Sequence, residues 1–192
     1  MYLPLEIWYY IIDLMPLEDQ LYNIRGVCKD WREKVLNKKK IDLSSALKKR
    51  LNVKLLTLFN NDNINELIIK DIPYSIPQEV MSKILLRYRK VEKLSLINID
   101  SYWSTFINIA RNKSLKELDI TDSNNILNYP IYSIVFNCKN IEKLILKNHP
   151  RLTKEMINWF INCFKNLKVI DARGCKKVKC LTVKKKNLQI QY

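Results

Sequence analysis

Glycine and histidine are scarce in this 192-residue sequence, and their scarcity excludes several kinds of active site. Only two residues are glycine, whereas loops that wrap phosphate groups need several glycines to bring the backbone close to the ligand. The single histidine, His149, precedes Pro150 in an expected loop, where we expect a surface residue rather than a catalytic base. No nucleophile–base pair and no paired acid motif is found. The sequence therefore predicts a protein that is not an enzyme and that needs no cofactor.

Cysteines and long apolar runs are also too few for other classes of protein. The five cysteines are odd in number and include no Cys-x-x-Cys pair, which fits neither a disulfide framework nor a zinc site. We expect buried thiols in a reducing compartment. No apolar run reaches the length of about 18 residues that spans a membrane, and Pro4 and Glu6 interrupt the start in a way that a signal peptide does not. A cytoplasmic or nuclear protein without a membrane partner is expected.

Positive charge is abundant, and it is distributed unevenly along the chain. The formal net charge is +15. Residues 1–37 carry four basic and six acidic side chains, a balance of −2, whereas residues 38–192 carry 30 basic and 13 acidic ones, a balance of +17. Two segments of opposite charge suggest two different partners. We therefore expect two parts, with a boundary after residue 37.

Residues 1–37 have the pattern of three short helices. Apolar residues recur at helical spacing after Pro4, a residue that the first turn of a helix tolerates. A second apolar series follows Pro16, and Gly26 suits the end of that helix. A third series lies on one side of residues 27–35. Helices this short bury little surface, so we expect the module to lean on a partner or on the rest of the chain.

The first part of the chain resembles the F-box over residues 3–36. The resemblance is carried by Leu3-Pro4-x-Glu6-Ile7 at the start and by Val27-Cys28-Lys29-x-Trp31-Arg32 at the end. The stretch from Asp19 to Val27 is slightly longer than the family pattern, which leaves the register of the middle helix open. An ordinary helical cap that uses Trp31 only for packing is the alternative.

The resemblance implies that this module docks on a Skp-family adaptor, which links it to a cullin–RING ubiquitin ligase. Such docking requires an apolar surface with a polar rim. By position, the adaptor-binding residues are Leu3, Pro4, Ile7, Leu14, Val27, Cys28 and Trp31.

A short apolar pattern recurs in the second part. It reads apolar, two variable, apolar, one variable, apolar, and its copies begin at Ile64, Val91, Leu115, Ile141 and Leu167. The intervals of 27, 24, 26 and 26 residues have the period of a leucine-rich repeat. A degenerate copy includes Ile41, and a truncated one spans residues 178–183. The sequence predicts an α/β fold, in which the F-box is followed by a leucine-rich-repeat solenoid of strand–helix units over residues 38–192, with a parallel sheet on the concave face.

Helices are expected between these strands. Two segments carry apolar residues at the spacing i, i+3, i+4, i+7, namely Ile131, Ile134, Val135 and Cys138 in one, and Met156, Trp159, Phe160 and Cys163 in the other. Cys138 and Cys163 close these helices and Cys175 follows a strand. This placement resembles the cysteine-containing class of leucine-rich repeat that is common in F-box proteins.

The variable strand positions predict a binding surface on the concave face. They mix apolar side chains with alternating charge, which suits a protein partner, although a solvated face without a ligand is an alternative. Basic residues also crowd near the C-terminus, where they suit an acidic or phosphorylated partner or keep terminal strands soluble. We do not expect nucleic acid as a partner, because no aromatic residues interleave that cluster. The candidate substrate-binding residues are Lys93, Asp119, Lys143, Ile145, Lys147, Asp171, Arg173, Lys176, Lys177 and Lys179.

The leading prediction is the substrate-recognition subunit of a Skp–cullin–F-box ubiquitin ligase. It binds the adaptor through residues 1–37 and an unidentified protein substrate through the repeats. Two alternatives stay open. One is a non-catalytic scaffold that uses the F-box contact without ubiquitylation of a substrate, and the other is a basic nucleic-acid-binding repeat protein.

Overall fold

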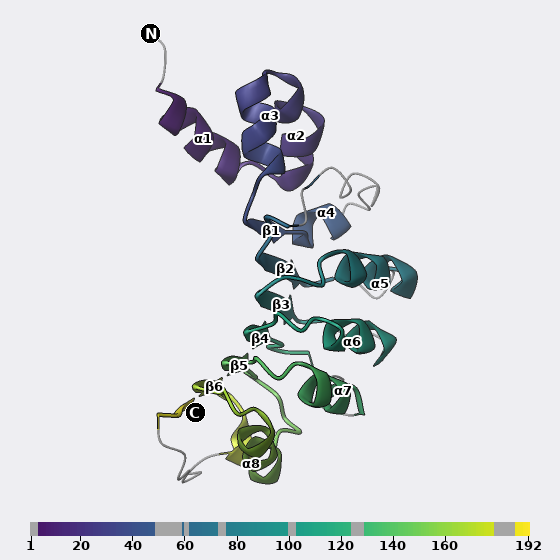
Figure 1. The fold of residues 1–192 in the computed structure, drawn as a ribbon, viewed down its shortest axis with the longest axis vertical. Coiled ribbons are helices and arrows are strands. Elements are labelled where there is room, and N and C mark those ends of the chain that lie inside the picture. The colour runs from purple at the N-terminus through teal and green to yellow at the C-terminus, as the bar shows by residue number, and fades with distance from the viewer. Residues whose placement is uncertain are drawn as a thin grey trace.

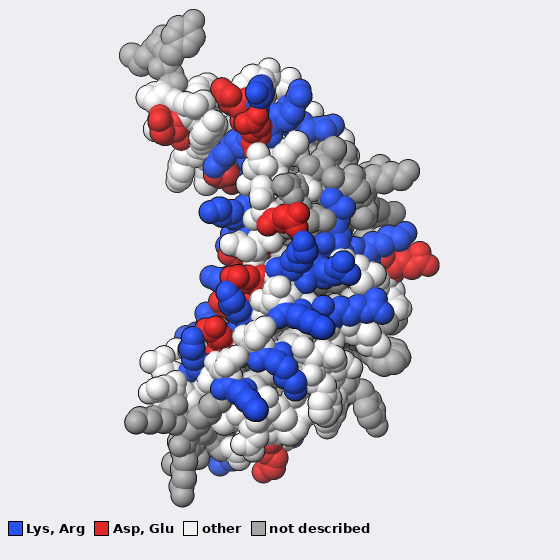
Figure 2. Space-filling model, in the orientation of Figure 1, with Lys and Arg blue, Asp and Glu red and all other residues white. Residues whose placement is uncertain are grey.

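The chain forms a helical module followed by a row of parallel strands with helices on one side. The computed structural model describes residues 4–48, 59, 62–72, 76–99, 103–123, 129–178 and 187–192. Figure 1 shows the strands stacked in one line, helices α5 to α8 along one side of that line, and the helical module beyond β1. The molecule is hollowed on the side of the strands (Figure 2).

The helical module is built from short segments separated by prolines and tight turns. Pro4 and Pro16 precede its first two helices. Gly26 was expected to end the second helix, but that helix ends at Tyr22, and Gly26 instead ends a 3-10 turn in which the N–H of Val27 bonds the carbonyl of Ile24 at 3.0 Å. The segments are α1 (Leu5–Leu14), α2 (Leu17–Tyr22), η1 (Ile24–Gly26) and α3 (Lys29–Leu36).

The sheet has seven parallel strands, and each pairs with the strand that comes next in the sequence. This order is the one that a chain of strand–helix units produces when each unit stacks on the previous one. The strands are β1 (Lys40–Asp42), β2 (Glu66–Lys70), β3 (Lys93–Ile97), β4 (Glu117–Asp119), β5 (Lys143–Ile145), β6 (Val169–Asp171) and β7 (Gln189–Gln191).

Helices connect successive strands. Pro77 precedes α5, and the hydroxyl of Thr153 accepts a hydrogen bond from the N–H of Met156 at 3.4 Å, which confirms Thr153 as an N-cap. The described helices of this part are α4 (Ser44–Lys48), α5 (Gln78–Arg87), α6 (Trp103–Ala110), α7 (Tyr129–Asn137), α8 (Lys154–Cys163) and the short η3 (Lys176–Val178).

A single column of aliphatic side chains runs through the core across the strands. These residues occupy the same register position, and each is buried between its neighbours. The predicted strand register is confirmed, including that of the degenerate first copy. The column consists of Ile41, Leu67, Leu94, Leu118, Leu144 and Ile170, and it ends at the half-buried Ile190.

The strand beyond β6 differs from the prediction. A truncated copy was expected at residues 178–183, but β7 is formed by Gln189–Gln191, with Ile190 paired to Ile170. Val178 is buried at the end of η3, and residues 179–183 lie outside the described part of the chain. An aliphatic residue between two polar ones was enough to add a strand, because the polar residues of an end strand can face water.

Helix α8 buries a face that is one residue away from the predicted one. Its buried residues are Ile157, Phe160 and Ile161, continued by Phe164 after the helix. Trp159 was expected on that face but is only half buried. Its ring points toward the neighbouring helix and packs on Tyr132 of α7 at a centroid distance of 4.8 Å. Contact with the neighbouring helix, rather than with the sheet, therefore explains this part of the apolar pattern.

Each strand from β2 to β6 is followed by a residue in the left-handed backbone region. These positions are Asp71, Asn98, Asp122, Asn148 and Gly174. Aspartate and asparagine tolerate this conformation better than other non-glycine residues. At Gly174, φ is +78°, and an added Cβ would also collide with Oδ1 of Asn148. Only glycine fits this turn.

His149 is buried, so the expectation of a surface histidine is wrong. Its loop folds inward, and Nε2 lies 2.6 Å from the carbonyl oxygen of Ile120, to which it donates. Among the residues that the structure describes, Nδ1 has no hydrogen-bond partner. Burial lowers the pKa of His149, although the Ile120 carbonyl and nearby aspartates oppose that effect. The ring therefore acts as a neutral structural bridge.

No helix in the described ranges is both long enough and apolar enough to cross a membrane.

Shortening a residue of the aliphatic column should destabilise the fold. Leu144→Ala and Leu118→Ala each remove fully buried methyl groups and should lower the free energy of unfolding by about 2–5 kcal/mol in urea denaturation. Asp119→Ala, one position along and pointing to the opposite face, should lower it by less than about 1 kcal/mol. Equal losses at Leu118 and Asp119 would contradict the strand register.

The buried His149 should make stability depend on pH. The unfolded chain titrates near the ordinary pKa of 6.5, and the folded chain titrates below it. Stability should therefore be full above that pKa and should fall as the pH decreases through the interval between the two values, because only the unfolded chain binds the proton there. Thermal melts of the wild type and of His149→Gln should show a steeper decline for the wild type below about pH 6.5. Parallel pH profiles would contradict this role.

Candidate functional site

The helical module exposes apolar side chains that its own packing does not use. Nearly every residue of α1 is apolar, yet only Ile12 is buried. Ile7 is 45% exposed, Leu14 is 68% exposed, and Val27, in the turn before α3, is 59% exposed. Exposed apolar residues gathered on one small unit are typical of a surface that another protein covers.

Of the predicted adaptor-binding residues, most are exposed. Pro4, Ile7 and Leu14 lie along α1, and Val27 and Cys28 lie in the turn that leads into α3. Leu3 lies outside the described residues. The pattern did not single out two further exposed apolar residues of the module, Leu5 and Tyr22.

Trp31 is the exception among the predicted contacts. It is half buried, and its ring packs against that of Trp8 with centroids 5.1 Å apart and planes tilted by 43°. This contact joins α3 to α1. Trp31 therefore has at least a packing role.

One carboxylate fastens α1 to the start of the sheet. The Asp13 carboxylate forms one ion pair with Lys34 of α3 and another with Lys38, just before β1, each with a nitrogen–oxygen distance of 2.8 Å. Partial burial raises the pKa of Asp13, but the hydrogen bonds and charges of the two lysines outweigh burial and leave the pKa below its ordinary value. The carboxylate thus holds three segments of the chain together.

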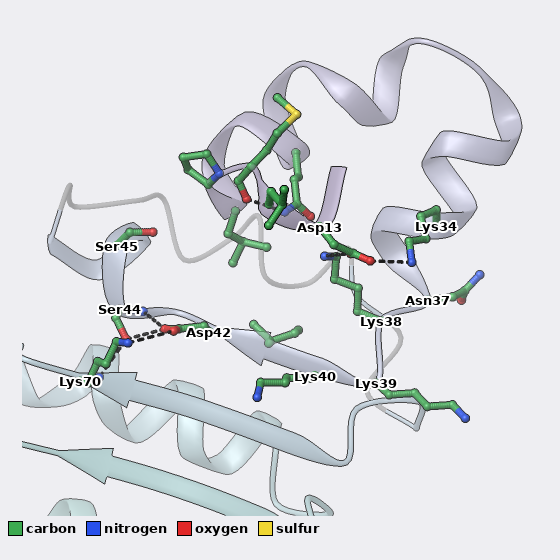
Figure 3. A pocket seen from close by; sticks show the side chains of 16 residues that line it. Asp13, Lys34, Asn37, Lys38, Lys39, Lys40, Asp42, Ser44, Ser45 and Lys70 are labelled. Atoms are coloured by element: carbon green, nitrogen blue, oxygen red, sulfur yellow. Dashed lines mark hydrogen bonds and ion pairs between the residues drawn. The ribbon is translucent and has the colours of Figure 1, made fainter. Parts of the chain in front are cut away.

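A cleft of about 980 Å³ lies between the module and the sheet. Figure 3 shows Asp13 with Lys34 and Lys38 at one side of the cleft, and Asp42 with Ser44 and Lys70 at the other. The N–H of Ser44 donates to Asp42 at 2.9 Å, and the N–H of Lys70 donates to the Ser44 hydroxyl at 2.9 Å. Because these polar groups bond one another, the cleft serves as a junction within the chain.

The concave sheet face carries a row of alternating charges. Lys40, Glu66, Lys93, Glu117 and Lys143 are successive partners in the strand register. Lys40 pairs with Glu66 at 2.7 Å, and Glu117 pairs with Lys143 at 2.7 Å and with Lys93 at 3.9 Å. The row therefore neutralises much of its own charge.

A second group of charges surrounds Asp171. Its carboxylate accepts from the guanidinium of Arg173 at 2.9 and 2.7 Å and lies 3.4 Å from the ammonium of Lys147. Burial raises the pKa of Asp171, but these cations outweigh burial and leave the pKa below its ordinary value. Asp119 is engaged in a similar way, since the N–H and hydroxyl of Thr121 donate to it at 3.0 and 2.7 Å.

The expectation that Ile145 and Asp171 offer exposed side chains is wrong. Ile145 is only 8% exposed, and Asp171 is also buried. In the register, Ile145 stands between Asp119 and Asp171. Side chains on a hollowed face crowd one another, so Ile145, which has a charged residue beside it on each adjacent strand, loses its contact with water.

The remaining predicted substrate-binding residues differ in their setting. Lys93, Asp119, Lys143, Lys147 and Arg173 share the concave face and retain some exposure. Lys176 and Lys177 are exposed in η3, after β6. Lys179 lies outside the described residues.

The part of the chain that the structure describes contains no metal-binding cluster, and two of its cysteines are buried thiols. No group of three or more histidine, cysteine, aspartate or glutamate side chains there is placed to hold a metal ion. Burial raises the pKa of Cys138 to about 12, and burial also raises the pKa of Cys175. Thiols that stay protonated are poor nucleophiles, so these two cysteines are packing residues.

Comparison with protein families identifies the N-terminal module. The family model of the F-box domain matches residues 2–42, which include the exposed apolar residues of the module and β1. F-box domains generally bind Skp-family adaptors within Skp–cullin–F-box ubiquitin ligases. A search of curated proteins finds no match to this chain.

The charge balance of the concave face can be tested at Glu117. Its carboxylate is half buried between Lys93 and Lys143. Glu117→Gln should lower the free energy of unfolding by about 0.5–1 kcal/mol at low salt, and the loss should shrink in about 1 M salt because ions screen the lysines. Thermal denaturation at two salt concentrations measures the effect. A loss that does not depend on salt would show that packing, not charge, is affected.

Proposed function

We propose that this chain is a non-catalytic substrate-recognition subunit of a Skp–cullin–F-box ubiquitin ligase that works in the cytoplasm or nucleus. The F-box module, which we place at residues 1–37, binds a Skp-family adaptor, and residues 38–192 bind a protein substrate. The observation that carries this proposal is the coincidence of the F-box match with exposed Ile7, Leu14 and Val27. Burying such side chains against a partner contributes about 25 cal/mol for each Å² of apolar surface removed from water.

We also propose that residues 38–192 are a leucine-rich-repeat array. The supporting observations are the intervals of 24 to 27 residues between copies of the apolar pattern, the sequential parallel pairing of the strands, and the left-handed turn after each strand from β2 to β6. Such arrays present extended surfaces on which a partner can lie. In this proposal the array positions the substrate, and the adaptor connects it to the ligase.

The adaptor contact can be tested with exposed residues, so that folding is preserved. Ile7→Glu combined with Val27→Glu places two carboxylates on the apolar surface of the module. Since a buried unpaired charge is costly at an interface, we expect the double variant to lose co-purification with a Skp-family adaptor and a cullin. Circular dichroism and thermal melts should match those of the wild type.

Leu86→Glu is the matched control, because Leu86 is an exposed apolar residue of α5, outside the module. This variant should bind the adaptor normally. Adaptor binding by a well-folded Ile7→Glu/Val27→Glu variant would overturn the proposed contact. If the wild type binds the adaptor but no protein in the cell turns over more slowly after its deletion, the chain acts as a scaffold rather than as a substrate receptor.

A further inference from the structure

The concave face carries little net charge, although residues 38–192 are strongly basic. Its positions on β1 to β6, together with Lys147 and Arg173 just after β5 and β6, hold six lysines and arginines against five carboxylates, an excess of one. Most of these groups are joined in the pairs described above. The excess positive charge of the chain must therefore lie elsewhere.

Part of this excess lies at the edge where the chain passes from each helix into the next strand. We define the basic edge as the four loops at residues 88–92, 111–116, 138–142 and 164–168. These loops contain eight lysines and arginines, all exposed, against two glutamates. Figure 2 shows Lys and Arg side chains gathered in a band that runs along the molecule beside the strands. The basic edge thus carries an excess of six positive charges.

Only some of these cations are neutralised within the chain. Lys116 pairs with Glu92 at 2.7 Å, and Lys168 pairs with Glu142 at 2.6 Å. Within the described ranges, Arg89, Arg111 and Lys113 have no carboxylate partner. A helix dipole favours a cation at the C-terminal end of a helix, but that effect accounts for one cation in each loop, whereas three of the four loops contain two or three.

One end of the basic edge adjoins a hollow of about 720 Å³. Among the described residues, four cations line it, Lys83, Arg87, Arg89 and Lys90, together with the carboxylate of Asp62, which pairs with Lys90 at 2.7 Å. A concave site lined by cations focuses the electrostatic field and attracts anionic groups. The hollow therefore extends the basic edge from the loops to the end of α5.

Aromatic side chains flank the other part of the basic edge. Phe136, near the end of α7, is 64% exposed, and the ammonium of Lys139 lies 5.7 Å from the centre of its ring. Tyr132, one helical turn earlier, is half exposed and packs on Trp159. Aromatic residues and arginine are enriched at protein interfaces relative to the rest of the surface.

We infer that the basic edge, with Phe136 and Tyr132 beside it, docks an extended acidic segment of the protein substrate, and that the concave face is not the main charge-recognition surface. This inference rests on the proposed function, since a ligase receptor must hold a protein. Neighbouring strands lie about 5 Å apart, so the loops form a closely spaced row of cations that an extended chain can follow. Carboxylates meet the free cations, and apolar side chains of the segment pack on the two rings.

The test uses a fluorescein-labelled poly-glutamate peptide with phenylalanine at intervals and measures its binding to the full chain by fluorescence anisotropy. Arg89→Glu, Arg111→Glu and Lys113→Glu together should weaken binding on the order of tenfold or more, and this loss should shrink as salt rises. Phe136→Ala with Tyr132→Ala should weaken binding of this peptide but not of a poly-glutamate peptide without phenylalanine.

A matched control has the same change in charge at another place. Arg151→Glu, Lys154→Glu and Lys70→Glu alter cations that retain exposure before and at the start of α8 and at the end of β2, and they should leave the affinity within about twofold of the wild type apart from the small general effect of net charge. If this control weakens binding as much as the first triple variant, or more, the inference is overturned. It is also overturned if labelled oligothymidylate binds more tightly than the peptide through the same residues, because the edge is then a nucleic-acid surface.

Adaptor co-purification separates this inference from the proposed function. Both triple variants should bind a Skp-family adaptor normally, since no substitution lies in the F-box. Normal adaptor binding with unchanged peptide affinity in the first triple variant overturns the basic-edge inference alone. Loss of adaptor binding by the wild type would instead overturn the proposed function.

Discussion

The column of aliphatic side chains through the strands is the constraint on which the rest of this structure depends. A single strand–helix unit cannot cover its own buried residue, so Leu94 is sheltered by Leu67 and Leu118, and they are sheltered by their own neighbours. This dependence fixes the parallel order of the strands. It also places equivalent loop positions side by side at the two edges, where left-handed turns such as those at Asn148 and Gly174 follow one another.

The same stacking decides how charge is distributed. Strand positions that face the hollow come close enough to form ion pairs, as Glu117 does with Lys93 and Lys143. Loop positions at the edge project into water, and Arg111 and Lys113 find no carboxylate partner among the described residues. A strongly basic sequence therefore becomes a nearly balanced concave face and an unbalanced edge. Meanwhile the F-box module keeps apolar residues exposed, because its short helices have too little volume to bury them. The two parts of the chain thus offer partners different chemistry.

The sequence predicted the features that depend on the local period of its apolar residues. It did not predict the features that depend on contacts between neighbouring strand–helix units. The register of the strands followed from the apolar pattern, and even the degenerate copy at Ile41 aligned. The inward turn of His149 was missed, because its acceptor is the carbonyl of Ile120, in the preceding unit. Burial of Ile145 was missed because it arises from charged side chains on adjacent strands. The last strand, with Ile190, was placed too early, since one aliphatic residue leaves almost no periodic signal. The Leu-Pro and Trp-Arg strings identified the F-box region, but not that Trp31 packs on Trp8.

Hydrogen–deuterium exchange of the full chain, with and without a Skp-family adaptor, tests the central claim that the apolar surface of the F-box module is a docking surface. We expect the adaptor to slow exchange in α1 and in the residues from Tyr22 through α3, while exchange in β3 to β6 and in the loops of the basic edge stays unchanged. Slowed exchange in the strands or the basic edge without any change in the module would contradict the account. So would an unchanged pattern throughout the chain at adaptor concentrations that saturate other F-box domains.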